Sequence, residues 1–141
     1  LHIPFLAISP LHSLARAAAA EAEADFYIPM IDARRMEVYA AVYDSDMRQR
    51  EAPQALVLDE QCFAGFRGEG RRVAFCGNGS NKYRELMQGQ RDCLFTDVVC
   101  SARHVVLPAA EAYGRGEFQN LAYFSPYYLK PPHITTPKKV L

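Results

Sequence analysis

The segment from Phe26 to Asp44 constrains the fold of this chain more than any other. Residues 26–31 form an apolar run rich in residues that favour β-strands, and residues 36–44 alternate between two sets of side chains, as in a half-buried strand. One set is Met36, Val38, Ala40 and Val42, and the other is Glu37, Tyr39, Ala41 and Tyr43. Because a short polar turn joins the two segments, the pattern predicts a β-hairpin.

The patterns on either side of the hairpin predict an α/β domain. Before it, residues 3–8 favour a short buried strand, and residues 11–24 favour an alanine-rich helix with Ser9 at its N-cap and Pro10 in its first position. After it, the sequence predicts strands at 55–58, 72–76 and 94–95 and helices at 60–66, 82–87 and 102–113. Pro108 is expected to remove one hydrogen bond from the last of these helices.

Size and charge exclude several classes of protein. The 141 residues suffice for one compact domain with a single hydrophobic core. Sixteen Lys and Arg residues balance sixteen Asp and Glu residues, whereas a domain that holds RNA alone carries a basic excess, because phosphate contacts supply much of its affinity. If the protein acts on RNA, we therefore expect a partner protein to make most of the contacts with that RNA. No apolar run approaches the roughly 20 residues that span a bilayer, so no membrane association is expected.

Residue spacings typical of catalytic and metal sites are missing from the sequence. The four histidines form neither H-x-x-x-H nor H-E-x-x-H, and no serine lies in G-x-S-x-G. No two cysteines have the C-x-x-C spacing, which favours free thiols in a reducing cytoplasm over a zinc or redox site. We predict that this chain has no catalytic residue, no metal ligand and no cofactor, and that it is cytoplasmic.

The turn of the hairpin holds the first candidate binding residues. Asp32, Arg34 and Arg35 can bind an anion or hold the charged groups of a partner. The alternative is a solvated turn with a local ion pair that contributes little. Asp32 and Glu37 lie near the same turn, but five positions apart in an extended strand they are expected to face opposite ways. We predict that Asp32, Arg34 and Glu37 form a polar cluster rather than a metal site.

Two further segments have both a functional and a purely structural interpretation. The run Gly77-Asn78-Gly79-Ser80 follows an expected strand and opens a helix, where a backbone can approach a phosphate or an adenine. It matches neither G-x-G-x-x-G nor the Walker loop, so a tight turn is the alternative. The run 126–130 could be a docking tail, but a last strand packed on the domain, with disorder beyond about Thr135, is the simpler interpretation.

The order of four motifs along the chain matches that of one protein family. The motifs are Ile3 to Ser9 ahead of the alanine-rich helix, Ile31 to Arg34 with Glu37 to Tyr39, Val73 to Gly79, and Ser125 to Lys130. The second resembles the IDAR-x-x-EVY signature of the TsaB family, also called YeaZ, and the others resemble its first strand, its V-x-x-x-G-x-G turn and its closing P-x-YLR. Two features depart from the family. Arg35 and Met36 stand in place of its Met-Gly, and the motifs of its first half are absent.

The resemblance implies a fold. TsaB proteins resemble actin-like ATPases of the ASKHA superfamily, which have two ribonuclease-H-like halves, each a mixed sheet flanked by helices. This chain would be mainly the second half. Residues 1–24 would then be a linking strand and helix from the first half, residues 25–130 the C-terminal ribonuclease-H-like domain, and residues 131–141 a flexible basic tail.

The resemblance also implies a function. The chain would be a non-catalytic partner subunit of the bacterial complex that makes threonylcarbamoyladenosine in tRNA, binding and activating the catalytic subunit TsaD. ATP would be handled by partners such as the ATPase TsaE, and tRNA would be reached only through the complex. The motif positions that would bind are Asp32, Arg34, Glu37, Tyr39, Gly77 and Gly79. The alternatives are a glycoprotease-type metallopeptidase and a nucleotide-binding regulatory domain that uses Asp32 and residues 77–80.

If the chain is half of a two-domain protein, the apolar face that would pack against the other half is uncovered. We expect that face near residues 3–8, 11–24 and 121–129. Because soluble monomers rarely expose large apolar patches, the chain is expected to self-associate as a twofold homodimer. The alternative is a monomer that closes on its own core.

Overall fold

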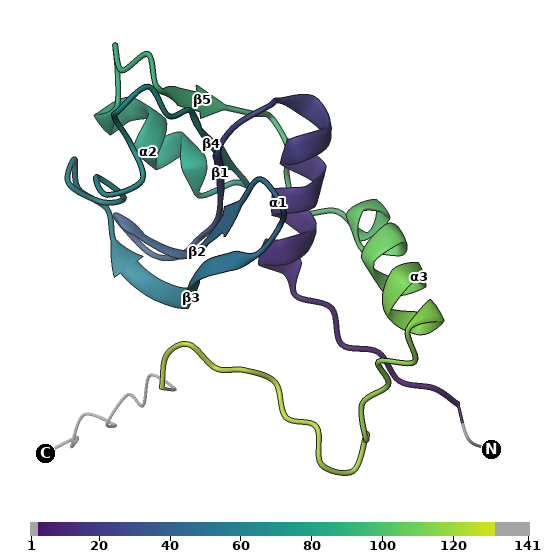
Figure 1. The fold of residues 1–141 in the computed structure, drawn as a ribbon. Coiled ribbons are helices and arrows are strands. Elements are labelled where there is room, and N and C mark those ends of the chain that lie inside the picture. Colours follow the sequence, from purple (N-terminus) through teal and green to yellow (C-terminus); the bar gives the residue numbers. More distant parts are fainter. Residues whose placement is uncertain (1–2, 132–141) are drawn as a thin grey trace, which may run out of the picture.

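A five-stranded mixed sheet in the order β3-β2-β1-β4-β5 forms the centre of the computed structural model, which describes residues 3–131 (Figure 1). The strands are β1 (Phe26–Asp32), β2 (Glu37–Asp44), β3 (Gln49–Val57), β4 (Val73–Cys76) and β5 (Cys93–Phe95). Strands β1 and β2 form the predicted antiparallel hairpin, and β3 pairs antiparallel with β2. Strand β4 pairs parallel with β1, and β5 parallel with β4.

Helices cover both faces of this sheet (Figure 1). They are α1 (Pro10–Glu21), α2 (Ser80–Leu86), the short 3-10 helix η1 (Ala102–His104) and α3 (Val106–Gly114). Helix α1 packs on one face of the sheet and α2 on the other, while α3 lies on the outer side of α1. The prediction of a mixed sheet flanked by helices is therefore confirmed.

The sheet has a hydrophobic core on each side. On the α1 side, Leu14 and Ala18 pack with Tyr43. On the other side, Val38 and Tyr83 belong to the second core. The prediction of a half-buried strand at 36–44 was wrong on this point, because a layer covers each face and both side-chain sets of β2 are needed to fill the two cores. Met36 precedes the strand and is exposed in the turn.

Helix α1 begins as the sequence predicts. Pro10 is its first residue, and the Ser9 hydroxyl accepts a hydrogen bond from the His12 N–H at 3.4 Å. The strand expected at 3–8 is absent from these described residues. Phe5 makes a single bridge to Gln119, because both edges of the sheet lie elsewhere, at β3 and β5.

The segment between β3 and β4 differs from its prediction. Strand β3 begins at Gln49, earlier than the expected 55–58, because an edge strand with an exposed face accommodates its polar residues. Residues 60–66 form successive turns instead of a helix. Asp59 still caps them, accepting hydrogen bonds from the N–H groups of Gln61 and Cys62 at 2.9 Å each. Phe63 has φ of 61°, which is incompatible with a right-handed helix.

The C-terminal part forms two helical pieces and an irregular segment. The helix expected at 102–113 is divided into η1 and α3, and Pro108 is the third residue of α3, where an N–H has no partner inside the helix. Pro108 therefore removes no hydrogen bond, which corrects that expectation. The last strand expected at 127–129 is absent, and Tyr127 and Tyr128 are exposed. The tail beyond residue 131, including the disorder predicted after Thr135, lies outside the described residues.

Candidate functional site

The β1–β2 hairpin presents the signature residues in a tight turn. Asp32 ends β1 and pairs with Val38 in the ladder, and the Ala33 N–H donates to the Glu37 carbonyl at 3.1 Å. The Glu37 N–H donates to the Arg34 carbonyl, also at 3.1 Å. Arg35 has φ of 57°, a left-handed conformation that costs a side chain about 1–2 kcal/mol. Within this turn, Arg35 is therefore the residue with the unfavourable backbone conformation.

Lys82 of α2 joins the two ends of this turn. Its Nζ forms an ion pair with the Asp32 carboxylate. The same Nζ donates to the carbonyls of Ala33 and Glu37 at 3.2 and 3.3 Å. Sequence reasoning missed Lys82. No local pattern in the sequence signals this contact, because it depends on the parallel pairing of β4 with β1, which brings the start of α2 beside the end of β1.

The glycine turn after β4 packs directly on β1. Gly77 has φ of 86°, and a Cβ atom there would lie 2.2 Å from the Met30 carbonyl oxygen. A Cβ on Gly79 would lie 3.0 Å from the backbone of Ile31, and the Gly79 N–H donates to the Met30 carbonyl at 3.0 Å. Close backbone packing alone accounts for both glycines. The structure thus favours the tight-turn interpretation of this run.

Asn78, in the same turn, fixes the end of β1. Its Oδ1 accepts a hydrogen bond from the Asp32 N–H at 2.9 Å. Together with Lys82, this contact brings four of the six predicted positions into one small region, namely Asp32, Glu37, Gly77 and Gly79.

The remaining signature residues have separate environments. The Glu37 carboxylate forms an ion pair with Lys130, so the carboxylates of Asp32 and Glu37 contact different lysines. Tyr39 is partly buried and lines a groove. Arg34 is exposed, and within residues 3–131 no ion pair involves its side chain. Of the three side chains predicted to form a polar cluster, only that of Asp32 pairs with Lys82, which reaches Glu37 through its backbone carbonyl. The Glu37 carboxylate and the Arg34 side chain lie outside this contact.

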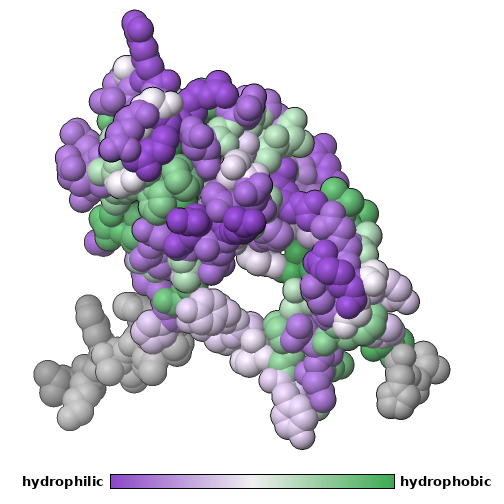
Figure 2. Space-filling model, viewed as in Figure 1, coloured by the Kyte–Doolittle hydropathy of each residue, from purple (hydrophilic) through white to green (hydrophobic). Residues whose placement is uncertain are grey.

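The groove beside Tyr39 is a largely apolar hollow of about 570 Å³. It lies between the start of α1, the β1–β2–β3 part of the sheet and the segment 119–130, which we call the strap. Its apolar lining includes Ile8, Leu11, Ile31, Tyr39, Phe124 and Tyr128. Figure 2 shows an opening between the strap and the body of the protein.

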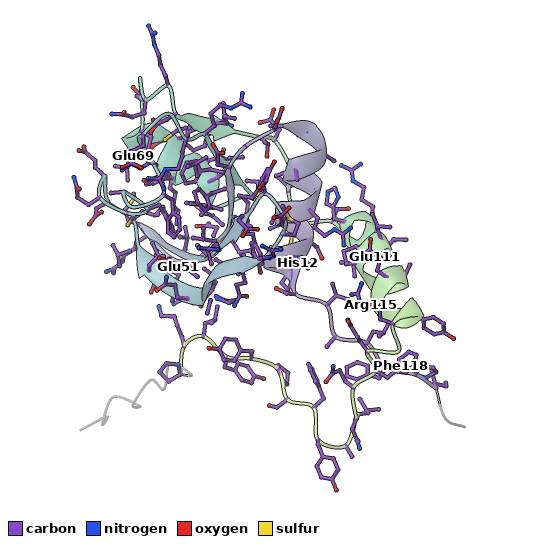
Figure 3. All side chains as sticks on the ribbon, in the orientation of Figure 1. His12, Glu51, Glu69, Glu111, Arg115 and Phe118 are labelled. Atoms are coloured by element: carbon purple, nitrogen blue, oxygen red, sulfur yellow. The ribbon has the colours of Figure 1, made fainter. Side chains whose placement is uncertain are left out.

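A second hollow, of about 190 Å³, separates α1 from α3 and is lined by charged residues. Arg16 of α1 makes a two-pronged ion pair with Glu111 of α3, with one N–O distance of 2.8 Å, and Arg115 pairs with Glu117. Figure 3 shows His12 on α1, Glu111 on α3 and Arg115 directly after α3. Each arginine here is paired with a carboxylate, so the cluster attaches α3 to α1 rather than forming an anion site.

These contacts shift the pKa values of the cluster. The hydrogen bond from Arg16 lowers the pKa of Glu111 below its ordinary value. Burial, followed by the charge of Arg16, lowers the pKa of His12. His12 also lies 5.3 Å from Tyr43, ring centre to ring centre. Glu111 therefore stays charged and His12 neutral near pH 7.

Within residues 3–131, no three His, Cys, Asp or Glu side chains lie close enough together to hold a metal ion. The four cysteines are free, and burial raises the pKa of Cys76 to about 12. That thiol is therefore protonated and unreactive at neutral pH. None of the described helices has both the length and the apolar character needed to cross a membrane.

Comparison with known proteins finds two solved structures with a similar fold. No protein-family model and no curated protein matches the chain. Among solved structures, an uncharacterized protein of Pseudomonas aeruginosa with similarity to peptidase YeaZ is 28% identical, with a TM-score of 0.69 over 90% of this chain. YeaZ from Pseudomonas aeruginosa is 30% identical, with a TM-score of 0.66 over 89% of this chain.

The matched region covers 59% of each of those two proteins. It includes nearly the whole of this chain, and the identity exceeds what a shared fold alone would require. The five-stranded mixed sheet with helices on both faces agrees with the ASKHA-like fold of these structures. The chain is therefore similar to YeaZ over nearly its whole length.

Proposed function

We propose that this chain is a non-catalytic partner subunit of the bacterial complex that makes threonylcarbamoyladenosine in tRNA, binding and activating a TsaD-like catalytic subunit. The observation that carries the proposal is the match to YeaZ at 30% identity over 89% of the chain. Because the chain spans 59% of that structure, the activity and partners of the whole protein are part of the proposal.

The division of labour in the proposed complex follows from the charge of the chain. With equal numbers of acidic and basic residues, the chain has no net positive charge to hold tRNA, so tRNA reaches it only through the complex. ATP is handled by partners, including a TsaE-like ATPase, and the chain itself carries no cofactor. We place the complex in the cytoplasm, where tRNA is modified.

The β1–β2 hairpin is the surface that we assign to partner binding. Lys82 holds the Asp32 carboxylate and the carbonyls of Ala33 and Glu37, which gives the turn a fixed shape. Arg34 is exposed and forms no ion pair within residues 3–131. Its guanidinium can therefore form a bidentate contact with a partner carboxylate. Tyr39 adds an aromatic side chain beside it. Gly77 and Gly79 act indirectly, by holding the turn against β1.

A homodimer is a further proposed assembly. Helix α3 and the strap expose large apolar side chains, namely Val106, Leu107, Tyr113, Leu121, Tyr123, Tyr127 and Tyr128. Figure 2 shows hydrophobic side chains gathered on part of the α3 region. A second copy can cover this surface when no other partner does.

Copurification with a TsaD-like subunit tests the proposed partner surface. The chain should retain the catalytic subunit on a column, and Arg34→Ala should weaken binding about 10-fold or more, the usual effect of losing an interface arginine that matters. Arg91→Ala is the matched control, because Arg91 is also exposed but lies just before β5, at the opposite end of the sheet. Equal binding by wild type and Arg34→Ala would remove the hairpin from the interface, and no retention at all would refute the proposed partner.

A further inference from the structure

The strap is attached to the body mainly at its two ends. At its start, the Gln119 N–H donates to the Phe5 carbonyl at 2.8 Å, and the rings of Phe5 and Phe124 meet edge to face at 5.2 Å. At its end, Lys130 forms the ion pair with Glu37. The second attachment joins the strap to the β1–β2 hairpin, 93 residues earlier in the chain.

Between these ends the strap has few contacts. Tyr123, Tyr127 and Tyr128 are 87, 77 and 78% exposed. Within the described part of the chain, no backbone group of residues 125–130 forms a hydrogen bond to the body. Near its start the strap forms a turn in which the Asn120 carbonyl accepts from the N–H groups of Tyr123 and Phe124, at 3.0 and 2.9 Å, and the Asn120 side chain accepts from the Ala122 N–H at 3.0 Å. The far half of the strap is therefore held by the Lys130 ion pair and by the partly buried Leu129, which lines the groove.

That ion pair is partly exposed, with 44% of the Lys130 side chain and 20% of the Glu37 side chain accessible to solvent. An exposed ion pair of this kind changes the equilibrium between the attached and the detached strap by up to about five-fold. Holding several residues of free chain in one position is opposed by their conformational entropy. The attached and detached states of the strap are therefore close in free energy. Beneath the strap lies the apolar groove of about 570 Å³.

We propose that residues 125–130 form a releasable cover over this groove, closed by the ion pair between Lys130 and Glu37. When the pair breaks, the far half of the strap swings away from Phe124, which stays anchored on Phe5. Release uncovers Tyr39 and Ile31 at the bottom of the groove. Since Glu37 also belongs to the hairpin, a basic group that competes for Glu37 opens the groove. The cover does not depend on the identity of the partner proposed above.

Limited digestion with chymotrypsin tests the cover, because Tyr127 and Tyr128 are cleavage points that a protease reaches faster when the strap is detached. At low salt, Lys130→Gln should be cleaved there about three- to five-fold faster than wild type. Lys130→Arg keeps the charge and should behave as wild type. High salt should raise the wild-type rate to that of Lys130→Gln, because salt screens an exposed pair.

A control variant and a second measurement complete the test. Arg34→Gln removes a charge from the same turn without removing a described ion pair and should leave the cleavage rate unchanged. A groove-binding fluorescent dye such as anilinonaphthalene sulfonate should bind Lys130→Gln more strongly than wild type, while the thermal midpoint of the body stays the same. Equal cleavage rates for wild type and Lys130→Gln at low salt would overturn the proposal, and so would an equal acceleration by Arg34→Gln.

Discussion

At the scale of single residues, the hairpin signature is shaped by atoms far away in the sequence. Lys82 contacts Asp32, Ala33 and Glu37 through one ammonium group. Gly77 meets the Met30 carbonyl from the neighbouring strand. The sequence identified Asp32, Glu37 and Gly77 by their local motifs, but it could not identify the lysine that joins them, since that contact depends on how β4 pairs with β1.

Gly77→Ala should destabilise the protein strongly. The new Cβ would lie 2.2 Å from a backbone oxygen, and the residue would keep a φ of 86°, so the expected loss is about 2–4 kcal/mol of unfolding free energy. Gly89→Ala is the matched control, because Gly89 has φ of 84° but open space around it. Gly89→Ala should lose only about 1 kcal/mol of unfolding free energy. Chemical denaturation of the two variants measures the difference, and equal losses would contradict the close packing at Gly77.

Lys82→Met should loosen the hairpin. The change keeps most of the aliphatic side chain but removes the partner of Asp32 and two hydrogen bonds to carbonyls. We expect Lys82→Met to lose about 1–2 kcal/mol of unfolding free energy. Amide hydrogen exchange at Ala33 and Glu37 should also become faster. Lys82→Arg should restore part of the loss. If Lys82→Met matched wild type in both stability and exchange, Lys82 would not hold the turn.

At the scale of elements, the sequence patterns predicted helices and strands most reliably where the backbone is regular and one or both faces of the element are buried. Helix α1 begins at Pro10 as predicted, and β1 and β2 form the expected hairpin. The predictions failed where the backbone departs from a regular conformation, as at Phe63 with φ of 61°. They also failed at 3–8 and 127–129, where an apolar run predicts a strand but no sheet edge is available to pair with it.

The attachment of α3 to α1 should weaken in acid. Since Arg16 lowers the pKa of Glu111 in the folded protein, the pair stabilises the fold above the unfolded carboxylate pKa of about 4.3 and loses that effect as the pH falls through the lower folded value. Glu111→Gln should therefore be less stable than wild type at pH 7, and the difference should vanish in strong acid. Glu60→Gln, at an exposed glutamate, is the control. A difference that persists unchanged below pH 3 would contradict the ion pair.

At the scale of the whole molecule, many of the exposed large apolar side chains of the described residues belong to α3 and the strap. Light scattering across a dilution series should show the mass of a dimer at high concentration and of a monomer at low concentration. Substituting Leu107, which is exposed on α3, by Glu should shift the transition to higher concentration because a charge opposes burial of that surface. A monomer mass at every concentration would reject self-association.

Reconstitution of threonylcarbamoyl transfer to tRNA decides whether the chain has the proposed function. A TsaD-like catalytic subunit and a TsaE-like ATPase are combined with ATP, tRNA and a threonylcarbamoyl donor, with and without this chain. The modified adenosine should form much faster when the chain is present, and the chain alone should make no product and cleave no protein. Transfer that is equally fast without the chain, or peptide cleavage by the pure chain that one point mutation abolishes, would contradict it.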